Sequence, residues 1–287
     1  MLPRSIATAA LALAVGTGTA AAESVRMAVT DIAGMEDLQR EFGAFQDALA
    51  EATGYEVELF PVNSRTAAVE AMRADQVDFV LTGPAEYVVF QTLTDAEVVV
   101  GWQRPDYFAQ IVALADGPVQ SVEDLRGETV SFGDVGSTSQ HLAPAQVLAD
   151  YGLAYGEDYE PVIINRNVAV EALIRGDIAA IGMNFDHLRR IREAFPETAF
   201  QVVARGRDLP NDVLIVAPDV PDEIVETVRT AFIEDQDALM AAVLEGTDNQ
   251  KYEGGHFLPR VSDADYEYVR AMYRTIGVPQ FSEFVGD

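Results

Sequence analysis

The sequence predicts an α/β fold with largely parallel sheets, divided into two lobes. Short apolar runs typical of buried strands alternate with amphipathic helical patterns along most of the chain. At 287 residues the chain exceeds the roughly 100–200 residues of one domain, which indicates two lobes. An apolar fraction of 49% against 23% charged residues is ordinary for a globular protein.

The first half of the chain opens on a helix with Leu38, Phe42, Phe45 and Leu49 on one face. This pattern stops at Gly54, a residue typical of helix C-caps. The elements expected next are a strand over 55–59, a helix over 67–73 and strands over 77–82, 98–100 and 111–114.

The second half repeats this alternation. Ser121 and Asp124 have the spacing of a capping box before a short helix. The elements expected next are strands over 129–132, 162–164 and 178–183, and helices over 138–151, 168–175, 222–244 and 263–276. The string AVEA occurs at 68–71 and again at 169–172, each time before a predicted strand. This echo is either a coincidence or a sign of two similar lobes.

Residues 1–22 have the pattern of a cleaved secretory signal. Arg4 supplies a positive charge, residues 6–15 are apolar, and the alanines at 20–22 form a small-residue cleavage site. The apolar stretch is shorter than the roughly 20 residues that span a bilayer. We therefore expect a mature protein of residues 23–287 that is soluble in the periplasm.

Charge and composition exclude several classes of function. The chain has 47 Asp and Glu against 19 Lys and Arg, a formal net charge of -28. Such a charge repels phosphate backbones and anionic lipid headgroups, so we expect no nucleic-acid or membrane-surface partner. The absence of cysteine excludes disulfides, thiolate catalysis and cysteine-ligated metals.

Nothing in the sequence indicates an enzyme, a cofactor or a metal site. His141, His187 and His256 are dispersed, and each is interpreted as a surface or hydrogen-bonded structural histidine. No zinc-hydrolase, nucleophile-elbow, Walker or dinucleotide-binding motif occurs. Carboxylates are so abundant that no catalytic pair can be selected by residue type.

The most informative stretch is residues 133–144, GDVGSTSQHLAP. A predicted strand ends there, Gly136 frees the turn, and Ser137, Thr138 and Ser139 open a helix. A helix start has unpaired backbone N–H groups and a partial positive charge, and the hydroxyls add donors. This combination binds an oxyanion without a cationic side chain. One hydroxyl would suffice for an N-cap, so three in a row favour an anion site.

Four segments, in this order along the chain, resemble the phosphate-, phosphite- and phosphonate-binding periplasmic proteins of ABC importers. They are Val77-Asp78 with Gly83-Pro84 through Tyr87-Val88, then Ser137-Thr138-Ser139, Leu209 to Asp212, and Val261 to Tyr266. Together with the helix that runs to Gly277, they cover nearly all of residues 23–277. Each segment is a weak signal alone, and the ordered set is a strong one.

The resemblance implies a two-lobed type II periplasmic-binding-protein fold with a hinge of two crossing strands. Residues 23–106 and 208–287 would form lobe 1, and residues 107–207 would form lobe 2. The implied function is capture of a small oxyanion in the cleft between the lobes and delivery to an inner-membrane ABC permease with its ATPase. We also expect a monomer.

Two positions depart from the family's pattern. Arg65 stands where the family usually has a tyrosine, and Arg166 aligns with a position where the second lobe often has a histidine. Guanidinium groups bind oxyanions with two parallel hydrogen bonds, but on so acidic a chain both could instead pair with carboxylates. If they face the cleft, they favour a compact inorganic or carboxylated anion over an aminoalkylphosphonate.

Further binding candidates follow from their positions near predicted strand ends, where open α/β sheets bind ligands. Tyr87 and Tyr107 are such residues, although a tyrosine more often packs with its ring half-buried. The resemblance adds Asn184 and Asp186, at positions where family members present polar groups to the ligand's substituent. Trp102 could wall the cleft, although a lone tryptophan is more often in the core.

Three other functions stay open from the sequence alone. A ligand-sensing protein that docks on a sensor kinase would have the same lobes and cleft. A binder of a different small anion would share the anion loop. A ferric-ion binder would need clustered tyrosine, histidine and carboxylate ligands.

Overall fold

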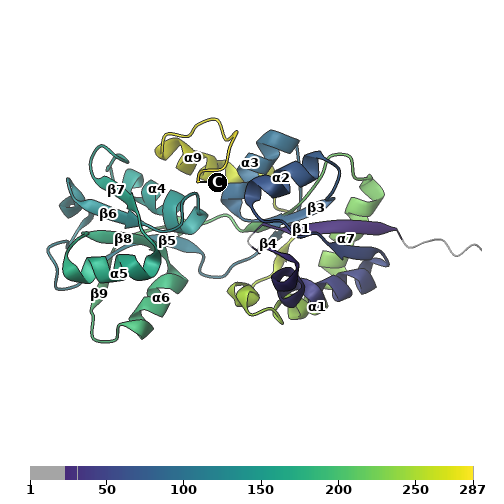
Figure 1. Ribbon diagram of the computed structural model, residues 1–287, viewed down its shortest axis with the longest axis horizontal. Coiled ribbons are helices and arrows are strands. Elements are labelled where there is room, and N and C mark those ends of the chain that lie inside the picture. Colours follow the sequence, from purple (N-terminus) through teal and green to yellow (C-terminus); the bar gives the residue numbers. More distant parts are fainter. Residues whose placement is uncertain (1–22, 31, 287) are drawn as a thin grey trace, which may run out of the picture.

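The computed structural model describes residues 23–30 and 32–286. The predicted signal segment, residues 1–22, lies outside the described residues. Two lobes, each built around one β-sheet, lie side by side along the long axis (Figure 1). Within the described ranges, no helix is both long and apolar enough to cross a membrane. The α/β fold class predicted from the sequence is confirmed.

Lobe 1 contains a six-stranded sheet in the order β11-β4-β10-β3-β1-β2. Its strands are β1 (Ser24–Val29), β2 (Glu56–Leu59), β3 (Phe79–Thr82), β4 (Glu97–Trp102), β10 (Asp212–Val216) and β11 (Phe257–Leu258). Its helices are α1 (Met35–Thr53), α2 (Arg65–Arg73), α3 (Pro84–Thr94), α7 (Asp222–Glu234), α8 (Gln236–Val243) and α9 (Glu267–Thr275), with the short turns η3 (Asp248–Tyr252) and η4 (Asp263–Tyr266).

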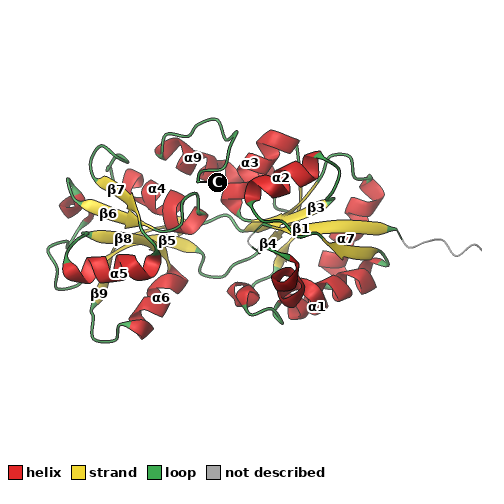
Figure 2. Ribbon diagram, in the orientation of Figure 1, coloured by secondary structure: helices red, strands yellow, loops and turns green. Residues whose placement is uncertain are grey.

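Lobe 2 contains a five-stranded sheet in the order β7-β6-β8-β5-β9. Its strands are β5 (Phe108–Leu114), β6 (Thr129–Phe132), β7 (Glu160–Ile163), β8 (Ala180–Asn184) and β9 (Phe200–Asp208). Its helices are η1 (Val122–Leu125), η2 (Thr138–Leu142), α4 (Ala143–Asp150), α5 (Arg166–Arg175) and α6 (Phe185–Ala194). Figure 2 shows helices packed against both faces of each sheet.

The two lobes repeat one arrangement. Each has three parallel strands with the first in the centre, β2-β1-β3 in lobe 1 and β7-β6-β8 in lobe 2. The two AVEA strings lie on α2 and α5, which precede β3 and β8 in the two repeats. The structure therefore favours two similar lobes over a coincidence of sequence.

The expectation of largely parallel sheets is wrong, because both sheets are mixed. β10 lies antiparallel to β3 and β4 in lobe 1, and β5 lies antiparallel to β8 and β9 in lobe 2. These are the strands by which the chain enters each lobe from the other. The two crossings run from β4 to β5 and from β9 to β10 and form the connection between the lobes.

Element boundaries follow the sequence closely where a cap is present. Gly54 ends α1 in the left-handed conformation, and Ser121 forms the predicted capping box with Asp124. The expected helix over 222–244 is interrupted at Asp235, and α3 was not expected. The sequence interpretation took Gly83-Pro84 as a strand break, but proline at the first helical position also starts a helix.

Trp102 lies in the core of lobe 1, as its residue type suggests. Its ring packs against Phe45, Tyr252 and Phe257, with centroid distances of 5.3, 5.5 and 5.0 Å. The side chain is 0% exposed, so it does not wall the cleft.

The C-terminal helix α9 ties the lobes together. The Tyr273 hydroxyl donates to the Ala85 carbonyl of lobe 1 at 3.0 Å. On the other side, the Tyr268 hydroxyl donates to Asp150 of α4 at 3.2 Å, and the Thr275 hydroxyl donates to Gln146 of α4 at 2.6 Å. α9 thus supplements the two strand crossings as a contact between the lobes (Figure 1).

Candidate functional site

The candidate site is a cleft between the lobes that consists of two adjoining chambers. We call the chamber lined by Ser137, Thr138 and Ser139 the inner chamber, and its volume is about 260 Å³. We call the chamber lined by Asp186, Asp248 and Tyr252 the outer chamber, and its volume is about 280 Å³. Lobe 1 contributes residues of α2, α3, β10 and η3, and lobe 2 contributes the start of η2 and the end of β8. The residues shared by both chambers are Arg104, Asn184, His187, Asp212 and Lys251.

The loop after β6 is held in a conformation that only glycine adopts easily. Gly136 has a φ of 74°, and a Cβ there would lie 2.3 Å from the Val285 carbonyl oxygen. The Gly136 N–H donates to His141 Nδ1 at 3.1 Å, and His141 Nε2 lies 3.0 Å from the Tyr155 hydroxyl. Burial lowers the pKa of His141 to about 4, so a neutral imidazole supports this loop at neutral pH.

All three hydroxyl residues of the predicted anion loop line the inner chamber. They open the π-helical turn η2, which continues directly into α4. The two helical segments together confirm the helix predicted over 138–151. The Ser137 hydroxyl makes no capping bond. The Ser137 N–H donates to the Asp134 carbonyl, and the His141 and Leu142 N–H groups donate to the Ser137 carbonyl, so the N–H groups that remain for a ligand at this helix start are those of residues 138–140.

Two of these hydroxyls already have partners. Thr138 Oγ1 accepts a hydrogen bond of 3.0 Å from the Ala85 N–H, which crosses the cleft to α3 of lobe 1. Ser139 Oγ accepts one of 3.0 Å from Asn184 Nδ2. The Thr138 oxygen acts as an acceptor in its bond, so its hydroxyl proton stays available for donation, whereas the Ser139 hydroxyl is also hydrogen-bonded to the Tyr107 side chain.

Arg65 both faces the cleft and pairs with a carboxylate, the two roles considered for it from the sequence. The residue starts α2 and lines the inner chamber, so it faces the cleft as one interpretation requires. Its Nε also lies 3.1 Å from Glu86 Oε1, a carboxylate that is almost fully buried. The guanidinium thus presents its remaining N–H groups from a fixed position.

Arg166 starts α5, the equivalent of α2, but it is not among the residues that line the inner or outer chamber. Its Nη2 donates to Gln140 Oε1 at 3.2 Å, and Gln140 lines the inner chamber in its place. Burial and the neighbouring Arg190 lower the pKa of Arg166. Arg166 thus contacts a residue of the chamber wall, Gln140, and is not itself among the residues that line either chamber.

Tyr87 does not reach the cleft either. Because α3 begins at Pro84, Tyr87 lies in its first turn with the ring 4.4 Å from the Tyr266 ring. Its hydroxyl donates to Asp263 Oδ1 at 2.8 Å, on the side of the C-terminal segment. Burial and this carboxylate raise the pKa of Tyr87.

The other predicted residues line the cleft. Tyr107 lies in the inner chamber under the Arg104 guanidinium, 3.9 Å above the ring, and burial raises its pKa to about 12. Asn184 lines both chambers and caps α6 by accepting from the His187 N–H at 3.0 Å. Asp186 lines the outer chamber and pairs with Arg189 at 3.5 Å.

The sequence interpretation missed a buried ion cluster on the wall of both chambers. The Asp212 carboxylate is 2% exposed and accepts from the Tyr252 hydroxyl at 2.7 Å. Arg104 Nη1 lies 3.5 Å and Lys251 Nζ 3.8 Å from its oxygens. Arg104 lies in the first crossing, Asp212 starts β10, and Lys251 and Tyr252 belong to η3. No local sequence motif could have connected residues of such distant segments.

The inner chamber is electrically balanced, in contrast to the whole chain with its net charge of -28. Three cations and three carboxylates line it: Arg65, Arg104, Lys251, Glu86, Asp134 and Asp212. A small anion that enters lies close to these positive groups. Its repulsion from the more distant carboxylates is screened by salt.

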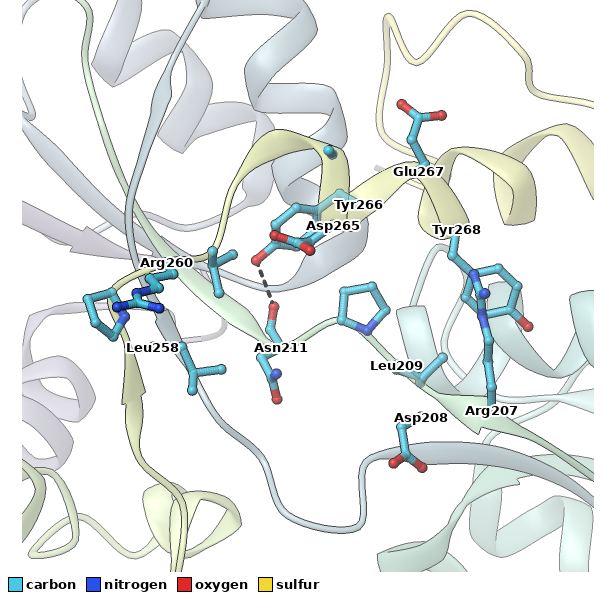
Figure 3. Close-up of a pocket in the computed structure, with 14 residues that line it drawn as sticks. Arg207, Asp208, Leu209, Asn211, Leu258, Arg260, Asp265, Tyr266, Glu267 and Tyr268 are labelled. Atoms are coloured by element: carbon cyan, nitrogen blue, oxygen red, sulfur yellow. Dashed lines mark hydrogen bonds between the residues drawn. The ribbon is translucent and has the colours of Figure 1, made fainter.

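A larger cavity than either chamber lies elsewhere, at the hinge (Figure 3), with a volume of about 880 Å³. It is lined by residues 207–211, 258–261 and 264–268, and the Tyr266 hydroxyl donates to the Asn211 carbonyl at 3.1 Å. Its charged groups give an excess of carboxylates and therefore disfavour an anion: Arg207, Arg260, Asp208, Asp265 and Glu267.

A metal site is not evident in the described part of the chain. Within residues 23–30 and 32–286, no group of three or more histidines or carboxylates is placed to hold a metal ion. A ferric-ion site would need clustered tyrosines, whereas the Tyr87 hydroxyl bonds to the C-terminal segment and Tyr107 lines the inner chamber.

Comparison with known families gives one match over most of the chain. A family profile described as the phosphonate ABC transporter periplasmic substrate-binding protein matches residues 27–255. The match includes the anion loop and all the residues shared by the two chambers.

Solved structures with the same fold are distant in sequence. PhnD1 from Prochlorococcus marinus in complex with methylphosphonate is 15% identical, with a TM-score of 0.63 over 88% of this chain and 97% of that chain. The binding protein component of an ABC phosphonate transporter from Pseudomonas aeruginosa is 18% identical, with a TM-score of 0.61 over 88% and 86%. The aliphatic sulphonate binding protein SsuA from Escherichia coli is 13% identical, with a TM-score of 0.57 over 93% of each chain.

Proposed function

The chain belongs to the family of periplasmic substrate-binding proteins of phosphonate ABC transporters, and from that premise we propose that its cleft captures a phosphonate, phosphite or phosphate. The family is a transporter component rather than an enzyme family, and its members act outside the cytoplasm. The partner that receives the ligand is an ABC permease with its ATPase, and the protein acts as a monomer without nucleic acid.

One observation supports this ligand class above the others. Ser137, Thr138 and Ser139 line a balanced chamber of about 260 Å³ inside a strongly acidic protein. Their hydroxyls and the N–H groups of the helix start are aimed at one region between the lobes. Charge-assisted hydrogen bonds to an oxyanion are strengthened there, because closure of the lobes excludes water.

The outer chamber fits a substituent on the phosphorus atom. Four apolar residues of lobe 1 line it and suit a short alkyl group, beside polar and charged side chains from both lobes. The apolar residues are Val29, Ile32, Phe42 and Leu81.

A thermal-shift screen tests the ligand class. Methylphosphonate, phosphite and phosphate are added at constant ionic strength, because added salt alone screens repulsion in so acidic a chain. A ligand at a hundredfold excess over Kd stabilises by about 2.7 kcal/mol, which raises Tm by several degrees. The proposal fails if no phosphorus oxyanion raises Tm while an amino acid or a metal ion does.

A further inference from the structure

His187 is a buried imidazole that none of the contacts above uses. It is the third residue of α6, its side chain lines both chambers, and the residue is only 8% exposed. Its N–H donates to Asn184 Oδ1, which fixes the residue at the helix start. In the part of the chain that the structure describes, Nδ1 has no hydrogen-bond partner. A buried polar atom without a partner is destabilising, and this imidazole belongs to a residue that lines both chambers.

The surroundings of His187 keep its imidazole neutral. Burial, and after it the positive charges of Arg166, Arg190 and Arg104, lower its pKa to about 3. The carboxylates that line the same chambers are Glu86, Asp134, Asp186, Asp212 and Asp248, and the remaining cations are Arg65 and Lys251. A neutral imidazole has one N–H donor and one nitrogen that accepts.

Donors are plentiful in the inner chamber, whereas uncommitted acceptors are scarce. Ser137, Arg65 and the first-turn N–H groups donate to anionic oxygens. The three carboxylates of the chamber already have partners: Arg65 for Glu86, the Gln140 amide for Asp134 and the Tyr252 hydroxyl for Asp212. A ligand oxygen that carries a proton therefore has His187 as the acceptor best suited to it.

We propose that the imidazole of His187 accepts a hydrogen bond from a protonated ligand oxygen, so that the cleft selects phosphonates over sulfonates. The proposal rests on the proposed function, because it concerns the same cleft. A phosphonate monoanion carries one O–H group, whereas a sulfonate of the same shape has none at neutral pH. The sulfonate would leave the imidazole acceptor unpaired, and such mismatches discriminate more strongly than size.

The pH dependence follows from the charge states. His187 is neutral throughout the range from pH 5 to pH 9, since its pKa lies near 3. The ligand alone then decides the profile: methylphosphonate binding weakens as pH rises and the ligand loses its second proton. Methanesulfonate binding stays flat, because this anion has no proton to lose.

Titration calorimetry of the intact protein with methylphosphonate and methanesulfonate tests the proposal. We expect the wild type to prefer methylphosphonate, and His187→Leu to lower this preference by about tenfold or more, the loss of one hydrogen bond to a charged ligand. His187→Gln retains an acceptor and should keep most of the preference. His256→Leu, at an exposed position outside the cleft, is the matched control and should change neither affinity.

The outcomes separate this proposal from the proposed function. Equal wild-type affinities for the two anions, an unchanged preference in His187→Leu, or methylphosphonate affinity that does not fall with pH would each overturn the role of His187. The pH profile needs no variant, so it applies even if His187→Leu fails to fold. Absence of binding by every oxyanion would instead overturn the proposed function.

Discussion

Removing the hydroxyls of the anion loop is expected to abolish most of the affinity for methylphosphonate. Ser139→Ala should weaken binding by about 10- to 100-fold, because a hydrogen bond to a charged group contributes about 1.5–3 kcal/mol. Ser137→Ala together with Ser139→Ala should weaken it further. Titration calorimetry measures both affinities directly.

The structure provides a control for this loss. Ser121 caps η1 in the same lobe, and its hydroxyl participates in a capping box outside the cleft. Ser121→Ala should therefore leave the affinity unchanged, even if it lowers stability slightly. An affinity that falls as much in Ser121→Ala as in Ser139→Ala would indicate a general loss of fold rather than a lost contact.

Neutralising the buried carboxylate of Asp212 is expected to have opposite effects on the free and the bound protein. Asp212→Asn deprives Arg104 and Lys251 of a buried charge partner, and breaking a buried pair costs about 3–5 kcal/mol of unfolding free energy. An oxyanion in the inner chamber supplies a new negative charge near both cations. Ligand-induced stabilisation should therefore be larger in Asp212→Asn than in the wild type.

Urea unfolding with and without methylphosphonate measures this difference. Asp177→Asn is the matched control, because Asp177 pairs with Arg175 on the surface, where ion pairs contribute little. A variant as stable as the wild type, or one that binds the anion more weakly, would contradict the role of Asp212 as a charge that the ligand replaces.

Local sequence signals predicted those parts of the site that one segment builds. The hydroxyl run after Gly136 identified the anion loop, because glycine, hydroxyls and the helix start are adjacent in the chain. The repeated AVEA string marked two equivalent helices, whose first residues are Arg65 and Arg166. Only the first of these arginines lines the cleft, because Gln140 occupies the corresponding place in lobe 2.

Parts of the site that distant segments assemble could not be predicted. Arg104, Asp212 and Lys251 meet only after two strand crossings and the packing of η3 against β10. Tyr87 was misplaced for a local reason, since its direction depends on the residue at which α3 begins. His187 was interpreted as a structural histidine. Only the structure shows that it is buried beside the cleft and that its Nδ1 has no hydrogen-bond partner among the described residues.

A crystal structure of the protein with methylphosphonate tests the central claim most directly. The account predicts the phosphonate oxygens in the inner chamber, within hydrogen-bonding distance of the hydroxyls of residues 137–139 and the N–H groups of Thr138 and Ser139. A ligand seated in the hinge cavity of Figure 3, or held between the lobes without any contact to residues 137–139, would contradict it.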